Sequence, residues 1–481
     1  MKSSVYYLIY VLFFIALSAC TVGPDFVTPT APSITTYSAA DNLHQFGEQT
    51  INPDKKISAN WWREFSSPEL NKVMEYGIKN NYSLTAMQKT LAQAMELMNA
   101  ANGQLWPQVA MNANGGRQKY GVALFGPTDF NIPPFTYYEV GPSFTYLIDI
   151  FGGTRRTIEK QQAMTEYQAY TFNAAYLALT GNMVTTALSI ATLNAEIELA
   201  KNIIREDKEN VRLVEHAFDL GSATQADILS ARSQLTEDET LLPGLYQQLS
   251  LAQNAFNMLV SRAPVDWQAP HFQLDHFELP KELPLSLPSE LVRTRPDILA
   301  AEAILHAASA DVGIATAQLY PSITLTGTLF QEALTPKDLF HASSKAWSFL
   351  GGISAPIFNG GQLRAQERAA FHAYESAYAN YQQVVLKSFV QVSDVLHALK
   401  YDEHAEQLQK RAVSTAKSSL ELARLSYQAG SVGILQVLDA ERLYAQAQLA
   451  YVKAKGQRYQ DTVQLYLALG GNSHLEYARL N

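Results

Sequence analysis

Three side chains near the C-terminus share one face of a predicted helix. Leu435, Asp439 and Arg442 are spaced four and three residues apart, so they lie one above another on an α-helix. The carboxylate and the guanidinium are then close enough to attract each other. By spacing alone they are better explained as a solvated ion pair, which is worth about 0.3–0.5 kcal/mol.

The rest of the chain lacks the residue patterns of enzyme chemistry. The sequence contains no HExxH, no GxSxG, no glycine-rich phosphate loop and no cluster of cysteine and histidine. His271 and His276 stand close together in a proline-rich stretch, but scattered loop histidines are usually solvated rather than metal ligands. We therefore expect no enzyme activity, no metal site and no bound cofactor.

The single cysteine, Cys20, follows an N-terminal secretory signal. Lys2 precedes an apolar run over residues 5–17, which is too short to span a bilayer comfortably. Ordinary signal cleavage requires small residues at positions −1 and −3, and Leu17 is large. A plain signal peptide that ends in cysteine by chance is therefore the poorer explanation. The sequence Leu-Ser-Ala-Cys instead resembles the lipobox of bacterial lipoproteins.

That resemblance implies that residues 1–19 are removed and that Cys20 carries an S-diacylglycerol and an N-acyl chain. Residues 20–60 would form a lipidated, extended N-terminal segment. Each buried CH₂ contributes about 0.8 kcal/mol, so several acyl chains anchor a protein firmly. Thr21 stands where an aspartate commonly retains lipoproteins at the inner membrane, which favours the outer membrane. With no second cysteine, the mature chain has no internal disulfide.

Composition excludes two further classes of protein. Charged residues make up 17% of the chain, the net charge is −9, and no Lys/Arg cluster offers a basic face to nucleic acid. Beyond the signal, no stretch reaches about 18 uninterrupted apolar residues, so no helix is expected to cross a membrane. If the chain spans a membrane, it must do so with β-strands.

The chain contains an internal duplication. LWPQV at Leu105 returns as LYPSI at Leu319, and IDIFGGTRR at Ile148 returns as APIFNGGQLR at Ala355. FDLGSATQADILSAR, from Phe218, returns as YQAGSVGILQVLDAER. The separation is far longer than the roughly 20–50 residues of a solenoid repeat, so a whole structural unit is duplicated.

Long proline-free tracts in each unit predict long helices. Apolar residues over 242–259 and 437–454 recur at alternating intervals of three and four, the heptad pattern of coiled-coil packing. The expected helices cover about 153–219, 222–262, 361–428 and 433–469. A helix of the first length would be about 100 Å long, which globular domains seldom need. An ordinary large helical bundle is the alternative.

Four shorter segments alternate apolar and polar residues, as β-strands do. They cover about 107–116, 136–150, 320–331 and 346–357, and their apolar faces are rich in aromatic residues. Their length is that of transmembrane strands, although a soluble sandwich with one polar face is the alternative. Four strands cannot close a barrel, and open edges in lipid leave backbone groups unpaired, so several chains must share it. Two chains would give eight strands and three would give twelve, and the periodicity allows both.

Several stretches resemble the TolC-like outer-membrane efflux factors, specifically their NodT lipoprotein branch. In order along nearly the whole mature chain they are CTVGPDFVTP, WWREFSSPELNKVMEYGIKNNYSL, VRTRPDILAAEAILHAASADVGIATAQLYPSITLTG, FNGGQLR and YQAGSVGILQVLDAERLYAQAQ. The resemblance implies an α plus transmembrane β-barrel fold, in which three chains form a twelve-stranded barrel joined to an α-helical periplasmic tunnel. Residues 61–288 would be the first repeat and residues 289–481 the second.

The same resemblance implies a function. Such proteins are passive outer-membrane exit ducts of tripartite efflux systems, which dock with a periplasmic adaptor and through it with an inner-membrane RND-type pump. Segments 61–76, 265–290 and the C-terminus would form an equatorial belt, and loops of about 120–135 and 331–345 would face outside. The pump and adaptor mainly choose the cargo. A lipid-anchored periplasmic coiled-coil scaffold without a pore is the alternative, but it leaves the four strands unexplained.

By the same resemblance, the long helices turn back at two periplasmic tips, where adaptors of related systems dock. The tip residues are Gly221 and Ser222 in the first repeat and Gly430 and Ser431 in the second. Glycine permits the positive φ that ends a helix. Either serine is expected to cap the helix that follows it.

The resemblance also implies a closed periplasmic mouth beside the second tip. Three Leu435 side chains would form an apolar plug, and Asp439 and Arg442 would hold neighbouring helices shut. A ring of Asp439 carboxylates would attract cations and disfavour anions. Asp227 is the corresponding carboxylate after the first tip, and Tyr427 matches a tyrosine that hydrogen-bonds across the mouth in some members.

This chain departs from part of the family at the mouth. Gln436 and Val432 occupy positions where some members carry a second aspartate and an arginine. We therefore expect a single acidic ring, as in the lipoprotein branch.

Overall fold

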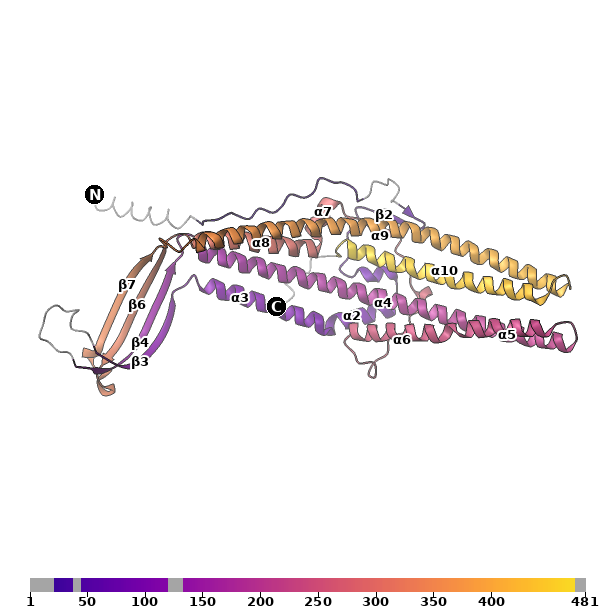
Figure 1. Ribbon diagram of the computed structural model, residues 1–481, viewed down its shortest axis with the longest axis horizontal. Helices are drawn as coiled ribbons and strands as arrows, with labels where there is room; N and C mark the ends of the chain where they lie inside the picture. Colours follow the sequence, from indigo (N-terminus) through magenta and orange to yellow (C-terminus); the bar gives the residue numbers. More distant parts are fainter. Residues whose placement is uncertain (1–20, 38–44, 120–132, 472–481) are drawn as a thin grey trace. The chain divides into compact units, whose positions relative to one another are not determined.

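The computed structural model of the chain describes residues 21–37, 45–119 and 133–471. The chain divides into two compact units, and each draws on both halves of the sequence (Figure 1). Unit 1 comprises Met1–Pro29, Thr90–Gln168 and Ala301–Tyr381. Unit 2 comprises Thr30–Lys89, Ala169–Ala300 and Gln382–Asn481. Corresponding segments of the two repeats therefore fold together.

Unit 1 contains a four-stranded antiparallel sheet. Its strands are β3 (Gln108–Gln118), β4 (Phe135–Ile148), β6 (Ser322–Ala333) and β7 (Lys345–Ser354). They are ordered β3-β4-β6-β7, so the pairing of β4 with β6 joins the two repeats. Within the described residues, β3 and β7 each pair on one side only. A single chain therefore leaves two rows of backbone groups free to pair with other chains.

The two faces of this sheet differ in chemistry. The register places Val109, Met111, Phe144, Trp347 and Phe349 on one face, and all of these except Phe144 are exposed large apolar side chains. The opposite face carries polar pairs that bond across strands, Asn112 to Ser143 at 2.7 Å, Asn114 to Glu139 at 2.6 Å and Thr328 to Ser348 at 2.7 Å. This is the alternation of a transmembrane barrel strand, with one face to lipid and one to the lumen.

Gly141 lets β4 and β6 approach closely. A Cβ at Gly141 would lie 2.1 Å from the carbonyl oxygen of Leu329. We expect Gly141→Ala to push the strands apart and to remove most of the detergent-resistant oligomer that the wild type should show on unheated gels. Gly352→Ala in β7 is the control, because its Cβ would meet nothing closer than 3.9 Å. Equal oligomer yields from the two variants would contradict a requirement for this close approach.

Two very long helices follow the two hairpins of the sheet. They are α4 (Gly153–Asp219) and α9 (Gln362–Gln428), of 67 residues each, so each is about 100 Å long. The shorter α3 (Tyr82–Gly103) and α8 (Pro296–Ala317) precede β3 and β6. By length and composition, α4 and α8 each contain a stretch apolar enough to cross a membrane, and half of each stretch is buried inside the structure.

The second helix of the first repeat differs from the expectation. It was predicted as one helix over 222–262, but it is two, α5 (Gln225–Glu239) and α6 (Leu241–Leu259), separated at Thr240. Pro243 explains the break, because it has no N–H for the Glu239 carbonyl and its ring clashes with that carbonyl. The corresponding helix of the second repeat, α10 (Ile434–Ala468), contains no proline and runs unbroken.

Several short elements of unit 2 pack against its long helices. They include the segments 61–76 and 265–290, which were predicted to form the equatorial belt. Trp61 stacks on Tyr466 of α10 with ring centroids 5.1 Å apart, and the Tyr466 hydroxyl donates to Glu64 at 2.7 Å. Met183 of α4 and Phe256 of α6 are buried in the same apolar core. The elements are β1 (Gln45–Phe46), β2 (Gln49–Asn52), η1 (Trp61–Phe65), α2 (Pro68–Asn80), η3 (Leu274–His276), β5 (Glu282–Pro284) and α7 (Pro288–Thr294).

Candidate functional site

The two helical hairpins end in turns of the same design. Gly221 after α4 has φ 75° and Gly430 after α9 has φ 73°. The backbone N–H of Ser222 and that of Ser431 each donate to a carbonyl five residues earlier, at 2.9 Å in both turns. This is the Schellman motif. No atom lies within 4 Å of a Cβ at either glycine, so the positive φ, rather than crowding, requires glycine.

The expectation that the tip serines cap the following helices was wrong. The hydroxyls of Ser222 and Ser431 donate to carbonyls of the preceding helices, at 2.9 and 2.8 Å. The Schellman turn directs each serine back toward the helix it follows. The cap of α5 is Thr224, whereas α10 begins after Gly433, which makes no side-chain cap.

Asp227 is part of a capping box at the start of α5. Its backbone N–H donates to Thr224 Oγ1 at 3.3 Å, and its Oδ2 accepts from the Thr224 backbone N–H at 2.8 Å. The two residues thus satisfy each other's free helix-end donors. The carboxylate of Asp227 is committed to this helix start, and its part in the mouth stays a prediction.

Removal of this cap should loosen the first turn of α5. We expect Thr224→Ala to lower its local stability by about 1 kcal/mol, so that hydrogen exchange of residues 225–228 speeds up about fivefold. Mass spectrometry of exchange in the whole protein measures this. Ser222→Ala is the control, since its hydroxyl bonds to the helix before it, and it should leave α5 unchanged. An effect of equal size in both variants would contradict the assignment of the cap.

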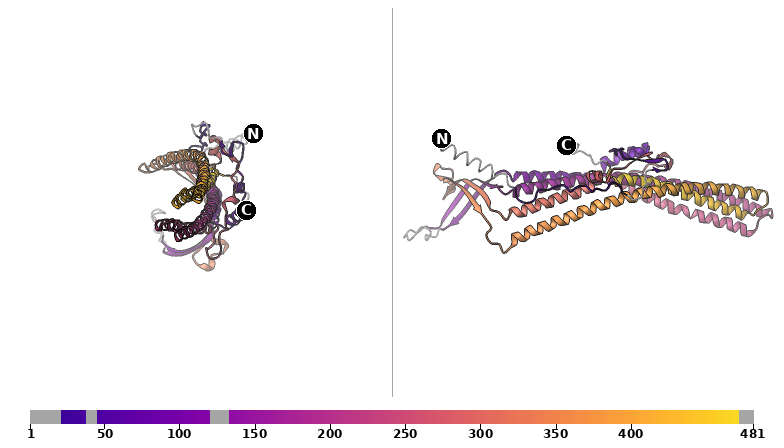
Figure 2. Two further views of the ribbon diagram at one scale, coloured as in Figure 1. Left: turned by 90° about the vertical axis from the view of Figure 1, so that its right-hand side faces the viewer. Right: turned by 90° about the horizontal axis from the view of Figure 1, so that it is seen from above.

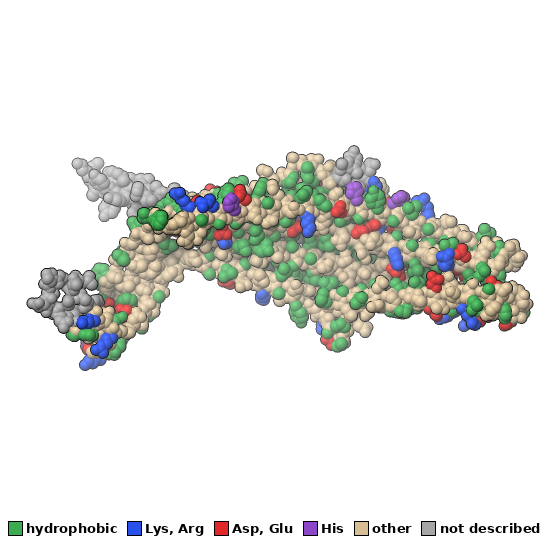
Figure 3. Space-filling model, viewed as in Figure 1, with side chains coloured by type: hydrophobic (Ala, Val, Ile, Leu, Met, Phe, Trp, Pro, Cys, Tyr) green, Lys and Arg blue, Asp and Glu red, His purple; other side chains and the backbone are tan. Residues whose placement is uncertain are grey.

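Leu435, Asp439 and Arg442 lie along one exposed face of α10. Leu435 is 50% exposed, and Arg442 Nη2 lies 2.6 Å from Asp439 Oδ1. Within one chain the two charges therefore form a solvated pair, and the leucine beside them remains uncovered. The space-filling view shows acidic and basic side chains interleaved with apolar ones over the ends of α5 and α10 (Figure 3).

An apolar core joins the two hairpins behind this face. It contains buried side chains of all four helices, including Val214 of α4, Ile228 of α5, Leu420 of α9 and Val437 of α10. Figures 1 and 2 show the four helix ends running side by side there. Tyr427 packs half-buried against this core, and its hydrogen bond across the mouth stays a prediction.

A charge network that the sequence analysis missed crosses the helices beside this core. Glu441 of α10 is only 9% exposed and accepts from Arg424 of α9 at 2.7 Å and from Asn210 of α4. Burial raises the pKa of the Glu441 carboxyl, and the Arg424 guanidinium opposes that rise. One local sign of this buried charge is present in the sequence, because Glu441 directly follows Ala440, an apolar residue of the heptad pattern. Its partners belong to other helices.

Each hairpin also contains a pair of carboxyl groups. Asp207 of α4 is 6% exposed, its Oδ2 has no hydrogen-bond partner, and with Asp238 of α5 it lines a cavity of about 20 Å³. Burial and the neighbouring Asp238 raise the pKa of Asp207 to about 8. Burial and Asp461 of α10 raise the pKa of Asp402 of α9 to about 7. Asp207 and Asp402 therefore each keep a proton to a higher pH than an exposed aspartate does.

Cys20, the predicted site of lipidation, lies outside the described residues. The segment that follows it is bound to the start of α4 in unit 1. The Val22 backbone N–H donates to the Phe151 carbonyl at 3.1 Å, and Arg156 bonds to Asp25 at 2.7 Å. Among the described residues, no group of three or more His, Cys, Asp or Glu side chains could hold a metal ion.

Comparisons with known proteins agree with this architecture. The family model "Outer membrane efflux protein" matches residues 77–260 and 287–471. Nodulation protein T of Rhizobium leguminosarum bv. viciae is 28% identical over 458 residues, 95% of this chain and 91% of that protein. The pyoverdine export outer membrane protein OpmQ of Pseudomonas putida is 30% identical over 426 residues, 87% of this chain and 88% of that protein. The outer-membrane channel OprN superposes with a TM-score of 0.86 at 27% identity, covering 94% of this chain and 100% of that one.

These likenesses confirm the predicted fold class, the outer-membrane location and the channel function. They extend over almost the whole chain and almost the whole length of the relatives. The match falls on both repeats, which contribute equally to the sheet and to the helical hairpins. The chain therefore belongs to the outer membrane efflux protein family and is an outer-membrane channel component of an efflux system.

Proposed function

We propose that three copies of this chain form a passive exit duct whose periplasmic mouth is closed by Leu435, Asp439 and Arg442. The exposed stripe on α10 carries this proposal, because a half-exposed leucine stands in line with a carboxylate and a guanidinium. Repeated around a threefold axis, the three leucines would form an apolar plug. The charges would then bridge to neighbouring chains as well as to each other, and the duct itself would catalyse no reaction.

The open edges of the sheet support the trimer. In the described residues, β3 and β7 each lack a neighbour on one side, and lipid provides no hydrogen bonds for them. Three copies would give twelve strands, which enclose a lumen, whereas an eight-stranded barrel is largely filled by side chains. The apolar face of the sheet would then contact outer-membrane lipid.

The chain would be anchored by acyl groups on Cys20 and would meet its partner at the tips. The segment after Cys20 is bound to α4 in unit 1, so the lipid would sit at a defined point of that unit. Gly221, Ser222, Gly430 and Ser431 form two turns of equal geometry, which offer a repeated surface to a periplasmic adaptor. The adaptor would connect the duct to an inner-membrane RND-type pump.

Single-channel conductance in planar bilayers tests the mouth. We expect small, cation-favouring currents from the wild type and currents at least threefold larger from Asp439→Ala/Arg442→Ala. The matched control removes Glu198 and Lys201, an exposed pair of the same i,i+3 type on α4 at 2.8 Å, and should behave as wild type.

Two other outcomes would change the proposal. Equal, large currents from wild type and variant would support the duct but contradict a gate formed by Leu435, Asp439 and Arg442. No current from any protein, despite correct trimers and membrane insertion, would favour the lipid-anchored scaffold.

A further inference from the structure

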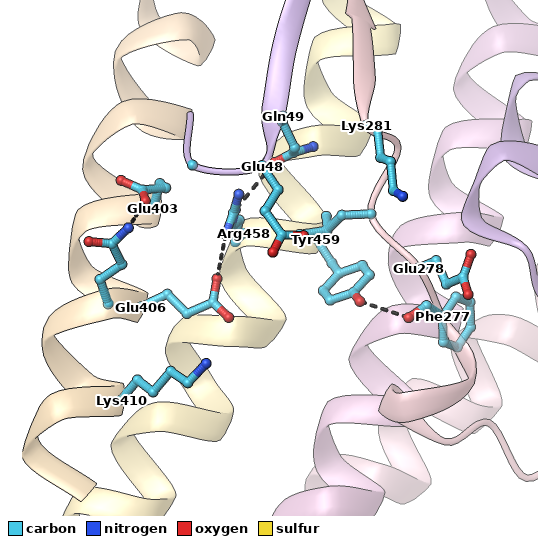
Figure 4. Close-up of a pocket in the computed structure, with 13 residues that line it drawn as sticks. Glu48, Gln49, Phe277, Glu278, Lys281, Glu403, Glu406, Lys410, Arg458 and Tyr459 are labelled. Atoms are coloured by element: carbon cyan, nitrogen blue, oxygen red, sulfur yellow. Dashed lines mark hydrogen bonds and ion pairs between the residues drawn. The ribbon is translucent and has the colours of Figure 1, made fainter. Parts of the chain in front are cut away.

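A pocket of about 630 Å³ opens in unit 2 and involves none of the mouth or tip residues. Its walls are the turn between β1 and β2, the segment 277–281, and one face each of α9 and α10 (Figure 4). Its volume lies within the range of roughly 300–1,000 Å³ that is usual for ligand sites.

The floor of the pocket is held together by an ion pair and hydrogen bonds. Arg458 of α10 pairs with Glu406 of α9 at 2.7 Å, and both side chains are largely buried. The same guanidinium donates to Gln49 at 3.2 Å. The Tyr459 hydroxyl donates to the Phe277 carbonyl at 2.7 Å, which fixes the ring as part of the wall. These groups are satisfied by one another, so the pocket is formed before any ligand arrives.

The rim of the pocket carries four charged side chains that form no ion pair within the described residues. They are Glu48, Glu278, Lys281 and Lys410, and all four are exposed. Figure 4 shows Glu48 descending from the turn in front of Tyr459 and Lys410 extending from α9 on the other side. These two carboxylates and two ammonium groups line the same pocket, which is also lined by the Glu403 carboxylate that accepts from Gln407.

We propose that this pocket binds a short peptide that carries both carboxylates and a free ammonium group. A simple anion would meet the two glutamates, and a simple cation would meet the two lysines, whereas a zwitterion can pair with both. The half-buried Leu279 offers apolar surface to the aliphatic parts of such a peptide. In the periplasm, this chemistry belongs to the stem peptides of the cell wall and to soluble peptides released from it.

The test measures binding of the tripeptide L-alanyl-γ-D-glutamyl-meso-diaminopimelate to the full-length protein in detergent, by calorimetry. We expect Lys281→Gln/Lys410→Gln and Glu48→Gln/Glu278→Gln each to weaken binding at least tenfold. The lysine pair should also stop distinguishing the tripeptide from its carboxyl-amidated form, and the glutamate pair should stop distinguishing it from its N-acetylated form. Lys387→Gln, an exposed lysine elsewhere on α9, is the matched control and should bind as wild type.

Cosedimentation with intact cell-wall sacculi distinguishes the two sources of peptide. Retention of wild type but not of the variants would identify the wall itself as the ligand. Tripeptide binding without retention would identify soluble peptides, and either result supports the pocket. The proposal is overturned if wild type binds neither probe at millimolar concentration, or if Lys387→Gln weakens binding as much as the pocket variants do. Oligomer yield on unheated gels verifies that each variant is folded.

Discussion

Arg424→Leu should loosen the periplasmic tips more than any substitution of the exposed Asp439 and Arg442 pair. It would leave the buried carboxylate of Glu441 without its guanidinium partner, which lies at 2.7 Å. Removal of one partner of a buried ion pair costs about 3–5 kcal/mol. The lower end, about 3 kcal/mol, is expected because Arg424 itself is 48% exposed. Since Glu441 also bonds to Asn210 of α4, the loss should spread to the first hairpin.

Hydrogen exchange over residues 420–445 measures this loosening, and bilayer conductance should show larger leak currents. Arg424→Leu/Glu441→Leu should recover most of the protection, because it removes the unpaired charge along with its partner. Arg232→Leu is the control, since its pair with Glu215 at 2.7 Å is solvated and should be worth about 0–1 kcal/mol. If the double variant were as loose as the single one, the buried charge would not be the cause.

Raising the pH should loosen the α4–α5 hairpin. The pKa of Asp207 is about 8 in the folded protein against an ordinary value of 3.8, so the folded state holds a proton that the unfolded chain has lost. The stability from this proton is complete below about pH 4 and is lost as the pH rises through about 8. The loss should be of the order of a few kcal/mol.

The surroundings of Asp207 explain why ionisation is unfavourable there. Acidic groups face it from three helices, namely Glu206 of α4, Asp238 of α5 and Glu441 of α10. The nearby guanidiniums of Arg424 and Arg442 are already paired, with Glu441 and Asp439 respectively. A second negative charge in the small cavity would therefore repel its neighbours without gaining a cation.

Hydrogen exchange of the α4–α5 hairpin between pH 5 and 9, corrected for the intrinsic pH dependence of exchange, tests this prediction. Asp207→Asn should remove most of the change, because the amide is neutral at every pH. Asp402→Asn should do the same in the α9–α10 hairpin, where the loss is complete once the pH has risen through the Asp402 pKa of about 7. Asp219→Asn, at the exposed end of α4, should keep the wild-type response. A wild-type response that persists in Asp207→Asn would rule out this carboxyl as its origin.

The sequence by itself determined the four strands of the sheet, the long helices, their order and the duplication. Alternation with a period of two marks the four strands, and long proline-free tracts and heptad spacing mark the long helices, because these patterns depend only on neighbouring residues. The positive φ of Gly221 and Gly430 was also predictable, since few other residues adopt it. Pro243 carried the information for the break at Thr240, but the heptad pattern around it obscured this signal.

Only the tertiary structure decided which side chains meet. Asn210 and Glu441 are 231 residues apart in sequence, and Arg458 contacts Gln49 across 409. Local periodicity shows which face of a helix is buried, but not which residue of another helix stands opposite, because that depends on the register between elements. The raised pKa values of Asp207 and Asp402 follow from the same contacts, since burial and a neighbouring carboxylate exist only once the helices have packed.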